Sequence, residues 1–413
     1  MIVGEGRIVT DFTNNWNNDD FLTFPNAPLG LIAMPGCEEL GAKVNAWLMR
    51  WHEQQEALED TPLFGVLGYN RENFLIDVQC PRFGTGEAKG MIRSSVRGYD
   101  LYILSDVGAY NVTYKMYGQS VPMSPDDHYQ DLKRIIAAVG GRAKRINIIM
   151  PMLYEGRQHR RTSRESLDCA LALQELQSMG VSNIITFDAH DPRVQNAIPL
   201  IGCDSVKPTY QILKALFRNQ LDLCLDRNHM MIMSPDEGAI DRNIFYSSVL
   251  GLDLGLFYKR RDYTTVVNGR NPIIAHEYLG DNVEGKDVFV SDDILASGES
   301  MLDLARELKK RKANRIFCAA TFALFTNGLA DFDKAYAEGT ISSVISTTLN
   351  YRTPELKVAP WFVEADMSKY ISYIVASLNH DRSLSGLLNP YDRIRNLVTR
   401  YQEKQAEAGI RLV

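Results

Sequence analysis

Three apolar runs of the sequence end in segments that carry acidic side chains. These segments are Asp188-Ala-His190, Ser234-Pro-Asp236 and Ser291-Asp292-Asp293. In open α/β sheets, ligands bind beyond the carboxyl ends of the strands. If the runs are strands, the three segments are therefore candidates for a binding site. Carboxylates near an imidazole can hold a divalent cation, and carboxylates can also bind the hydroxyls of a sugar.

The last of these segments continues into a short loop that suits a sugar phosphate. The loop precedes residues 300–312, whose apolar residues recur with the spacing of a helix face. Backbone N–H groups at a helix N-terminus, together with serine hydroxyls, bind phosphate. In the alternative interpretation, Ser297 or Ser300 only caps the helix after an acidic strand end. The candidate sugar-phosphate residues are Asp292, Asp293, Ala296, Ser297, Gly298, Glu299 and Ser300.

Asp188 and His190 are candidates for a metal site. They lie two residues apart, and side chains at that spacing on a strand point to the same side. Mg²⁺ prefers oxygen ligands and retains bound water. A single histidine of this kind is more often structural, but its position beside a second acidic strand end, at Asp236, favours metal binding. The candidate metal ligands are thus Asp188, His190 and Asp236.

Two basic segments supply the charge that a polyphosphate would require. Gly156-Arg157-Gln158-His159-Arg160-Arg161 follows a predicted strand, and Lys259-Arg260-Arg261 follows an apolar run at 254–258. Short basic runs are commonly solvated surface. In an acidic protein with acidic metal-type sites, however, they are the cations that polyphosphate chemistry needs. The sequence contains no Walker phosphate loop, which disfavours an ordinary P-loop kinase.

The apolar runs alternate with amphipathic stretches, a pattern typical of parallel sheets covered by helices on both faces. We predict an α/β fold with two doubly wound parallel-sheet domains. The predicted strands lie at 29–34, 101–104, 146–150, 184–187, 230–233, 288–290 and 316–320, and the predicted helices at 38–58, 126–138, 163–179 and 300–312. The predicted units are an N-terminal arm (1–25), an N-terminal domain (26–204), a C-terminal domain (205–385) and a C-terminal helix or tail (386–413).

The composition is that of an ordinary folded protein. The 413-residue chain has a net charge of −6, with 45% hydrophobic and 23% charged residues, which excludes wholesale disorder. The mild acidity argues against general nucleic-acid or membrane-surface binding. No apolar run approaches the ~20 residues that cross a bilayer, and the polar N-terminus shows no secretory signal. Six cysteines without CxxC or Cys/His ligand spacing indicate reduced thiols in a cytoplasmic protein.

The order of these segments resembles that of the ribose-phosphate pyrophosphokinase family, also called phosphoribosyl-diphosphate (PRPP) synthetases. The resemblance covers residues 29–385. Arg82-Phe-Gly-Thr-Gly-Glu87 looks like the adenine loop of the family, and Ser95-Val-Arg-Gly-Tyr-Asp-Leu-Tyr-Ile103 looks like the strand after it. The remaining resemblances are to the ATP segment (156–160), the histidine motif (187–190), the serine-proline-aspartate motif (233–238), the catalytic flexible loop (259–261) and the PRPP loop (292–300).

The resemblance implies a phosphoribosyltransferase-like fold and a ribose-phosphate diphosphokinase (EC 2.7.6.1 type). Such an enzyme transfers the diphosphoryl group of ATP to the anomeric hydroxyl of ribose 5-phosphate, with Mg²⁺ as the cofactor. It implies a homo-oligomer, dimer-based and commonly a hexamer, with the Phe83 loop serving a neighbouring subunit. The implied residues are Lys259 and Arg261 for catalysis, Phe83, Glu87, Arg157 and Gln158 for ATP, residues 292–300 for ribose 5-phosphate, and Asp188, His190 and Asp236 for the metal.

The sequence departs from the family pattern at several positions. His159 stands where the family usually has aspartate, Thr85 where it has an acid, and Ala296 where its PRPP loop has aspartate. Two other functions stay open. A phosphoribosyltransferase would use the 292–300 loop but would need neither the ATP segment nor the flexible loop. A non-catalytic regulatory paralogue would have no reason to keep Lys259 and Arg261.

Overall fold

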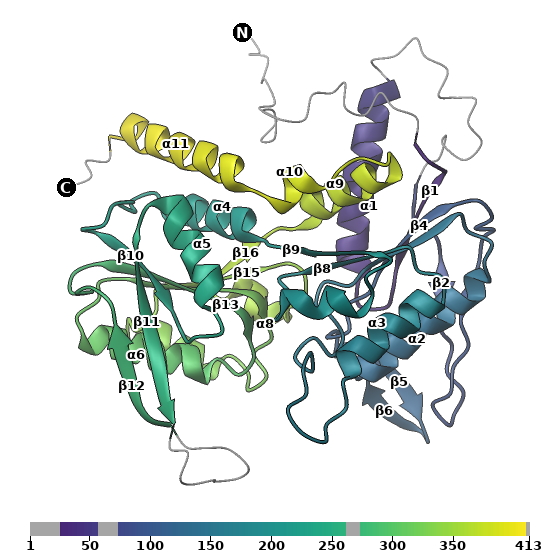
Figure 1. The fold of residues 1–413 in the computed structure, drawn as a ribbon, viewed down its shortest axis with the longest axis horizontal. Coiled ribbons are helices and arrows are strands. Elements are labelled where there is room, and N and C mark those ends of the chain that lie inside the picture. Colours follow the sequence, from purple (N-terminus) through teal and green to yellow (C-terminus); the bar gives the residue numbers. More distant parts are fainter. Residues whose placement is uncertain (1–24, 57–72, 262–272, 410–413) are drawn as a thin grey trace.

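The computed structural model describes residues 25–56, 73–261 and 273–409, which form two sheet-centred halves (Figure 1). The predicted N-terminal arm lies outside these residues. The first sheet has five parallel strands in the order β1-β4-β7-β8-β9. Their bounds are β1 (Leu29–Ala33), β4 (Asp100–Leu104), β7 (Arg145–Ile149), β8 (Asn183–Phe187) and β9 (Gly202–Val206).

The second sheet has seven strands in the order β12-β11-β10-β13-β14-β15-β16. All neighbours pair in parallel except the edge hairpin of β11 and β12, which is antiparallel. The bounds are β10 (Met230–Ser234), β11 (Asp253–Arg261), β12 (Ile273–Leu279), β13 (Asp287–Leu295), β14 (Ile316–Ala323), β15 (Ser343–Thr347) and β16 (Phe362–Ala365).

Helices cover these sheets, and local sequence explains where they begin and end. At α2, Ser124 and Asp127 form a reciprocal capping box, and Gly140 ends the helix in the left-handed conformation. At α6, the apolar face predicted from the sequence is buried. The helices are α1 (Glu38–Glu56), α2 (Pro125–Val139), α3 (Asp168–Ser178), α4 (Thr209–Asn219), α5 (Ile240–Leu250), α6 (Glu299–Lys310), α7 (Ala330–Ala337), α8 (Pro354–Val358), α9 (Ser368–Asn379), α10 (Ser385–Leu388) and α11 (Tyr391–Glu407), with a 3₁₀ turn η3 (Pro192–Ala197).

The predicted α/β class with doubly wound parallel sheets is confirmed. The first half also contains two small antiparallel pairs of strands. They are β2 (Val78–Gln79) with β3 (Met91–Ile92), and β5 (Thr113–Met116) with β6 (Gln119–Pro122). No helix within the described ranges is long and apolar enough to cross a bilayer.

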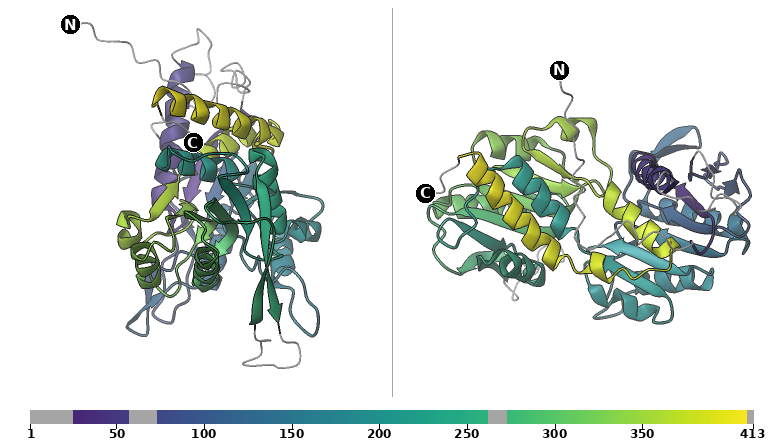
Figure 2. Two further views of the ribbon diagram at one scale, coloured as in Figure 1. Left: turned by 90° about the vertical axis from the view of Figure 1, so that its left-hand side faces the viewer. Right: turned by 90° about the horizontal axis from the view of Figure 1, so that it is seen from above.

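The C-terminal segment ties the two halves together. After β16 the chain returns to the first half, where α9 packs against α1 and Ser372 donates a hydrogen bond to the carbonyl of Val44 (3.2 Å). The chain then passes to the second half, where α11 packs on α4 and α5 (Figure 2). Two of the predicted domain limits differ from this arrangement. The limit at residue 204 falls within β9, which ends at Val206. The limit at residue 385 assigns α9 to the C-terminal domain, whereas α9 packs on the first half.

Glu39 on α1 forms an ion-pair cluster with residues of the connection between β15 and β16 of the second sheet. Its carboxylate lies 2.7 Å from Nζ of Lys357 and 3.3 Å from Nη2 of Arg352. Lys357 and Lys43 lower the pKa of Glu39 to about 2. The folded protein therefore binds this proton more weakly than the unfolded chain does, and the pair stabilises the fold only where Glu39 is ionised.

Glu39→Gln is expected to destabilise the protein by about 1 kcal/mol or less at neutral pH, because exposed ion pairs contribute little. The Glu39 side chain is 49% exposed. The loss should be complete above about pH 4.5 and shrink as the pH falls toward 2, which urea unfolding at several pH values would measure. Glu338→Gln is the control, because the ion pair of Glu338 in the described structure is a long one, with Lys334 of the adjoining helix α7 at 3.9 Å. A Glu39→Gln defect of constant size across this range would contradict the assignment.

Candidate active site

His190 and Asp293 join the two halves of the molecule at the carboxyl ends of their strands. His190 follows β8 of the first sheet, whereas Asp293 lies within β13 of the second, and His190 Nδ1 is 2.7 Å from Asp293 Oδ2. The hydrogen bond to Asp293 raises the pKa of His190. Although burial opposes it, the same bond holds the pKa of Asp293 below its usual range. Because Nδ1 is engaged, Nε2 is the nitrogen that remains to bind a ligand.

Asp188 is held by Arg242, a residue that the sequence analysis did not identify. Arg242 on α5 donates from Nε and Nη2 to the two oxygens of Asp188, each at 3.0 Å. Thr321 of β14 donates a further hydrogen bond to Asp188 (2.6 Å). These contacts occupy both carboxylate oxygens, so the geometry favours a positioning role for Asp188 over direct metal binding. Arg242 is the one basic residue of α5. It lies 54 residues after Asp188, so no short sequence motif links the two residues.

Asp292 lies beside this ion pair, with its Oδ1 3.7 Å from Arg242 Nη1. Burial, and next the neighbouring charge of Asp293, raise the pKa of Asp292 to about 8. The predicted strand 288–290 extends further than expected, because β13 pairs with β14 as far as Leu295. The two acids therefore lie within a strand and not after it. A cation or a hydroxyl donor at Asp292 would favour its ionised form.

Asp236 lies at the entrance to α5. Its Oδ1 accepts hydrogen bonds from the backbone N–H groups of Gly238 (3.0 Å) and Ala239 (3.2 Å). These bonds fix the turn between β10 and α5. Asp236 also contributes to the raised pKa of Asp292, so the two carboxylates act on each other electrostatically.

The loop from Ala296 to Ser300 ends at the first turn of α6. Gly298 is the N-cap residue, in the left-handed region (φ +87°), and no side-chain cap is formed at this described helix end. Ser297 Oγ accepts only a long hydrogen bond from Glu299 N (3.4 Å). The first N–H groups of α6 are thus available to an anion, which supports the phosphate interpretation over simple serine capping.

Gly298 is buried, and its neighbours leave no room for a side chain. A Cβ atom built at this position would lie 2.3 Å from Cζ of Phe332. The Phe332 ring is fully buried and packs against Phe325 and Trp361. The absence of a side chain at Gly298 is therefore required by packing and by backbone conformation.

Gly298→Ala is expected to lower the free energy of unfolding by about 2–4 kcal/mol, from the left-handed backbone and the overlap with Phe332. Urea unfolding measures this change. Gly339→Ala is the matched control, because Gly339 has a positive φ (+69°) and nothing lies within 4 Å of the added Cβ. The control should lose only about 1 kcal/mol. Equal losses in the two variants would show that Phe332 does not restrict position 298.

The predicted ATP segment meets this site at a cavity of about 130 Å³. Arg157 lines it together with Asp188 and His190, and Ile294 closes it from the second sheet. Gln158 is turned toward its own loop, where Nε2 donates to the carbonyl of Ser166 (2.8 Å). Arg157 is therefore the member of the predicted ATP pair that the structure brings to the cavity.

His159, one of the departures from the family pattern, has its own carboxylate partner. Its Nε2 lies 3.3 Å from Asp191 Oδ2, and its ring centroid is 5.4 Å from that of His190. Asp191 is also bound by Arg193. Asp191 thus contacts both His159 and Arg193.

Phe83 and Glu87 lie in a separate loop. The loop is closed by a hydrogen bond from Phe83 N to the carbonyl of Glu87 (2.7 Å), and Thr85 donates to Glu87 (3.0 Å). The Phe83 side chain is 56% exposed, and neither residue lines the cavity beside His190. Within one chain, the predicted adenine-binding pair is therefore not part of that cavity.

Lys259 and Arg261 lie at the end of β11. The backbone of Lys259 pairs with His276 and that of Arg261 with Ile273, with a register shift after Arg260. Residues 262–272 and the side chains of these two cations lie outside the described part of the structure. The fold thus places both residues on a hairpin at the edge of the second sheet (Figure 1).

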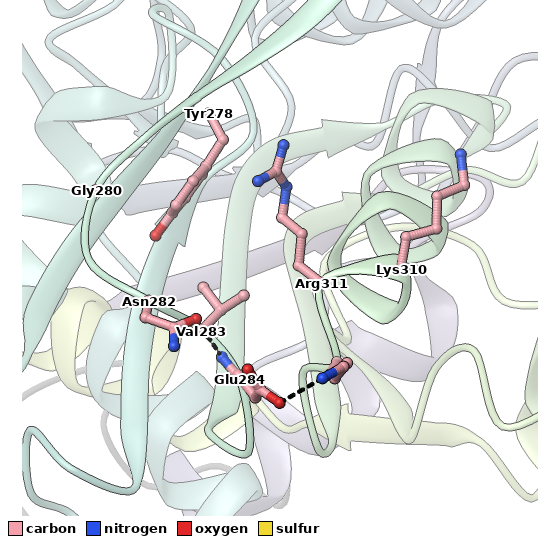
Figure 3. A pocket seen from close by; sticks show the side chains of 8 residues that line it. Tyr278, Gly280, Asn282, Val283, Glu284, Lys310 and Arg311 are labelled. Carbon is pink, nitrogen blue, oxygen red and sulfur yellow. Dashed lines mark hydrogen bonds and ion pairs between the residues drawn. The ribbon is translucent and has the colours of Figure 1, made fainter.

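A larger cavity of about 320 Å³ is not part of this site. It lies between Tyr278, the 280–284 turn and the end of α6 at residues 310–312, near the start of β13 (Figure 3). Glu284 and Lys312 form an ion pair at its rim (2.7 Å). Its lining contains none of the candidate site residues, which gather at the other end of the strand.

The two parallel sheets define a protein with a phosphoribosyltransferase-like fold. The chain matches the N-terminal domain of ribose phosphate pyrophosphokinase over residues 30–180 and the phosphoribosyl transferase domain over residues 204–351, together more than two thirds of its length. The protein belongs to the ribose-phosphate pyrophosphokinase family.

Individual relatives agree with this assignment. The ribose-phosphate pyrophosphokinase of Vibrio parahaemolyticus is 26% identical over 317 residues, which is 76% of this chain and 91% of that protein. The enzyme of that name from Shewanella oneidensis is 25% identical, with the same coverage. The crystal structure of phosphoribosylpyrophosphate synthetase from Mycobacterium smegmatis matches with a TM-score of 0.65 and 20% identity, over 86% of this chain and 99% of that one, which shows that the fold is shared.

Proposed function

We propose that this protein is a ribose-phosphate diphosphokinase, which converts ATP and ribose 5-phosphate to PRPP and AMP. The contact between His190 and Asp293 carries the proposal, because it joins the ATP side of the first sheet to the sugar-phosphate side of the second. The cavity beside this contact, lined by Arg157 from the first half and Ile294 from the second, supports one site shared by the two halves. A phosphoribosyltransferase would not require this combination.

In the reaction, the anomeric hydroxyl of the sugar attacks the β-phosphorus of ATP. A bond forms between that oxygen and the β-phosphorus, the bond to the bridging oxygen of AMP breaks, and the hydroxyl proton is lost. Such transfers depend mainly on positioning and on stabilisation of charge. We assign Lys259 and Arg261 to the charge on the transferring phosphoryl groups, and closure of their hairpin to the exclusion of water.

The 292–300 loop is proposed to hold ribose 5-phosphate. The uncapped N–H groups at the start of α6, with Ser297 and Ser300, would bind the 5-phosphate. Asp292 and Asp293 would accept hydrogen bonds from the ribose hydroxyls. A hydroxyl donor bound there would favour the ionised form of Asp292 and offset its repulsion with Asp293.

The donor set also fits Mg²⁺. His190 has its Nδ1 fixed by a carboxylate, an arrangement typical of histidine ligands, and Asp236 follows a neighbouring strand end with a carboxylate that could supply an oxygen. We propose His190 and Asp236 as ligands and Asp188 as the group that holds Arg242 beside them. Bound Mg²⁺ would neutralise the phosphate oxygens.

The proposal extends to assembly and location. The exposed Phe83 and its neighbour Glu87 do not reach the cavity of their own chain, which supports a loop that binds the adenine of a neighbouring subunit's ATP. We therefore propose a homo-oligomer, dimer-based and possibly hexameric. All six cysteines are free thiols, which supports a reducing, cytoplasmic location.

The test is AMP formation from ATP by the purified protein, with and without ribose 5-phosphate and Mg²⁺. We expect AMP only when all components are present. A regulatory paralogue would bind ATP without forming AMP. A phosphoribosyltransferase would release diphosphate from PRPP when given a nucleobase. Either result in place of AMP formation would overturn the proposal.

A further inference from the structure

Three side chains of different ligand types converge in the connection between α4 and β10. Cys224 Sγ lies 2.9 Å from Asp226 Oδ2 and 3.4 Å from His229 Nδ1, and His229 Nδ1 lies 2.8 Å from Asp226 Oδ2. One ligand atom from each residue falls within 4.8 Å of the others. We propose that Cys224, Asp226 and His229 bind a Zn²⁺ ion.

The donor types select the metal. Thiolate, imidazole and carboxylate are the ligands that zinc takes at about 2.0–2.3 Å, whereas Mg²⁺ avoids sulfur. Two ligands at those bond lengths around a tetrahedral ion lie about 3.4–3.6 Å apart. The Cys224–His229 separation of 3.4 Å already matches this value. The two shorter contacts are hydrogen bonds, which the metal would replace as the thiol proton leaves to solvent.

The geometry does not suit a nucleophilic triad. In such a triad the histidine uses one ring nitrogen for the nucleophile and the other for the acid. Here the same atom, His229 Nδ1, faces both Cys224 and Asp226. All three groups therefore point toward a common position, as ligands around one ion do.

The loop is preorganised around this position. Asp226 Oδ1 accepts hydrogen bonds from the backbone N–H groups of Asn228 (2.8 Å) and His229 (3.1 Å), which leaves Oδ2 turned toward Cys224. The carbonyl of His229 accepts a hydrogen bond from Asp287 N at the start of β13 (2.8 Å). Backbone bonds thus fix the ligand loop before any metal binds.

The sequence analysis found no Cys/His ligand spacing, because this cluster depends on the local fold and matches no common metal-binding motif. Cys224 and His229 are five residues apart, and the turn at Asp226 brings their ligand atoms together. The side chains of Asp226 and His229 are each 46% exposed, so a metal ion can enter and a water molecule can complete the coordination.

The site lies at the amino-terminal edge of the second sheet, whereas the candidate active site lies at the carboxyl edge. Helix α11 packs against the loop that carries this site. The buried Tyr401 donates a hydrogen bond to the carbonyl of Gln220 (2.8 Å), and the buried Gln405 donates one to the carbonyl of Leu223 (2.9 Å). The proposed zinc therefore has a structural role, which is to hold the loop on which the C-terminal helix docks. It does not depend on the proposed enzymatic function.

Cobalt substitution tests the site without measuring activity. The full-length protein is freed of metal with a chelator and titrated with Co²⁺, which reports sulfur ligation by a thiolate charge-transfer absorption. We expect this absorption to saturate at one Co²⁺ per chain and to disappear when Zn²⁺ is added. Co²⁺ bound near His190 would not produce it, because the described lining of that cavity contains no cysteine.

Cys224→Ser and His229→Gln should each abolish the saturable thiolate absorption, and Cys80→Ser is the control that should retain it. Cys80 is also half-buried, but its described neighbours include no histidine. Zn²⁺ should raise the melting temperature of the wild-type protein and of Cys80→Ser, but not that of the other two variants. A Co²⁺ spectrum without thiolate absorption in the wild-type protein would overturn the proposal. The same absorption in Cys224→Ser would also overturn it.

Discussion

Lys259→Ala and Arg261→Ala should each lower kcat by about 10²–10³-fold, with little change in the affinity for ATP. These cations are assigned to charge that develops in the transition state, and the loss of one such group has effects of this size. Both residues lie at the carboxyl end of β11, in the hairpin that β11 forms with the edge strand β12 of the second sheet. Steady-state kinetics on each variant, with ATP binding measured by calorimetry, give the two quantities.

Lys310→Ala is the control for the loss of a positive charge. Lys310 is 74% exposed at the end of α6, away from the candidate active site, so its kcat should match that of the wild-type protein. A variant of Lys259 or Arg261 that kept its kcat and only raised KM would show that the hairpin binds the ground state. The catalytic assignment would then be wrong.

His190→Ala and Asp293→Asn should each raise the Mg²⁺ concentration required for half-maximal activity by about 10–100-fold. His190 is the proposed ligand, and Asp293 orients its ring through the 2.7 Å contact between Nδ1 and Oδ2. Asp293→Asn should in addition raise the KM for ribose 5-phosphate, because Asp293 is also assigned to the sugar. Mg²⁺ titrations at saturating substrates, followed by substrate titrations, would separate the two effects.

The double variant tests whether His190 and Asp293 act together. If Asp293 influences Mg²⁺ only through His190, the combined effect on the Mg²⁺ requirement should be close to that of His190→Ala alone. Circular dichroism would confirm that each variant is folded. An unchanged Mg²⁺ requirement in folded His190→Ala would return this histidine to a structural role.

The central strands could be predicted because buried parallel strands are continuous apolar runs. β10 and β14 are of this kind, and the helix α6 before β14 shows a clear apolar face. β9, with the sequence Gly-Cys-Asp-Ser-Val, lies at a sheet edge and lacks such a run, so the pattern did not reveal it. The antiparallel direction of β12 was equally hidden, because strand composition does not encode the direction of pairing.

The site residues could be predicted as strand-end acids and loop residues, but their pairing could not. His190 and Asp293 are 103 residues apart, and Arg242 is 54 residues from Asp188. Only the approach of the two sheets creates these contacts. The role of Gly298 was hidden for the same reason, because Phe332, which excludes a side chain there, belongs to a different helix.

The most direct test of the proposed activity follows all phosphorus species at once. Phosphorus NMR of the protein with ATP, ribose 5-phosphate and Mg²⁺ should show AMP and PRPP appearing in equal amounts as ATP disappears. Omission of ribose 5-phosphate should leave ATP intact. Formation of ADP with a sugar bisphosphate, or no consumption of ATP by the folded protein, would contradict the assignment as a diphosphokinase.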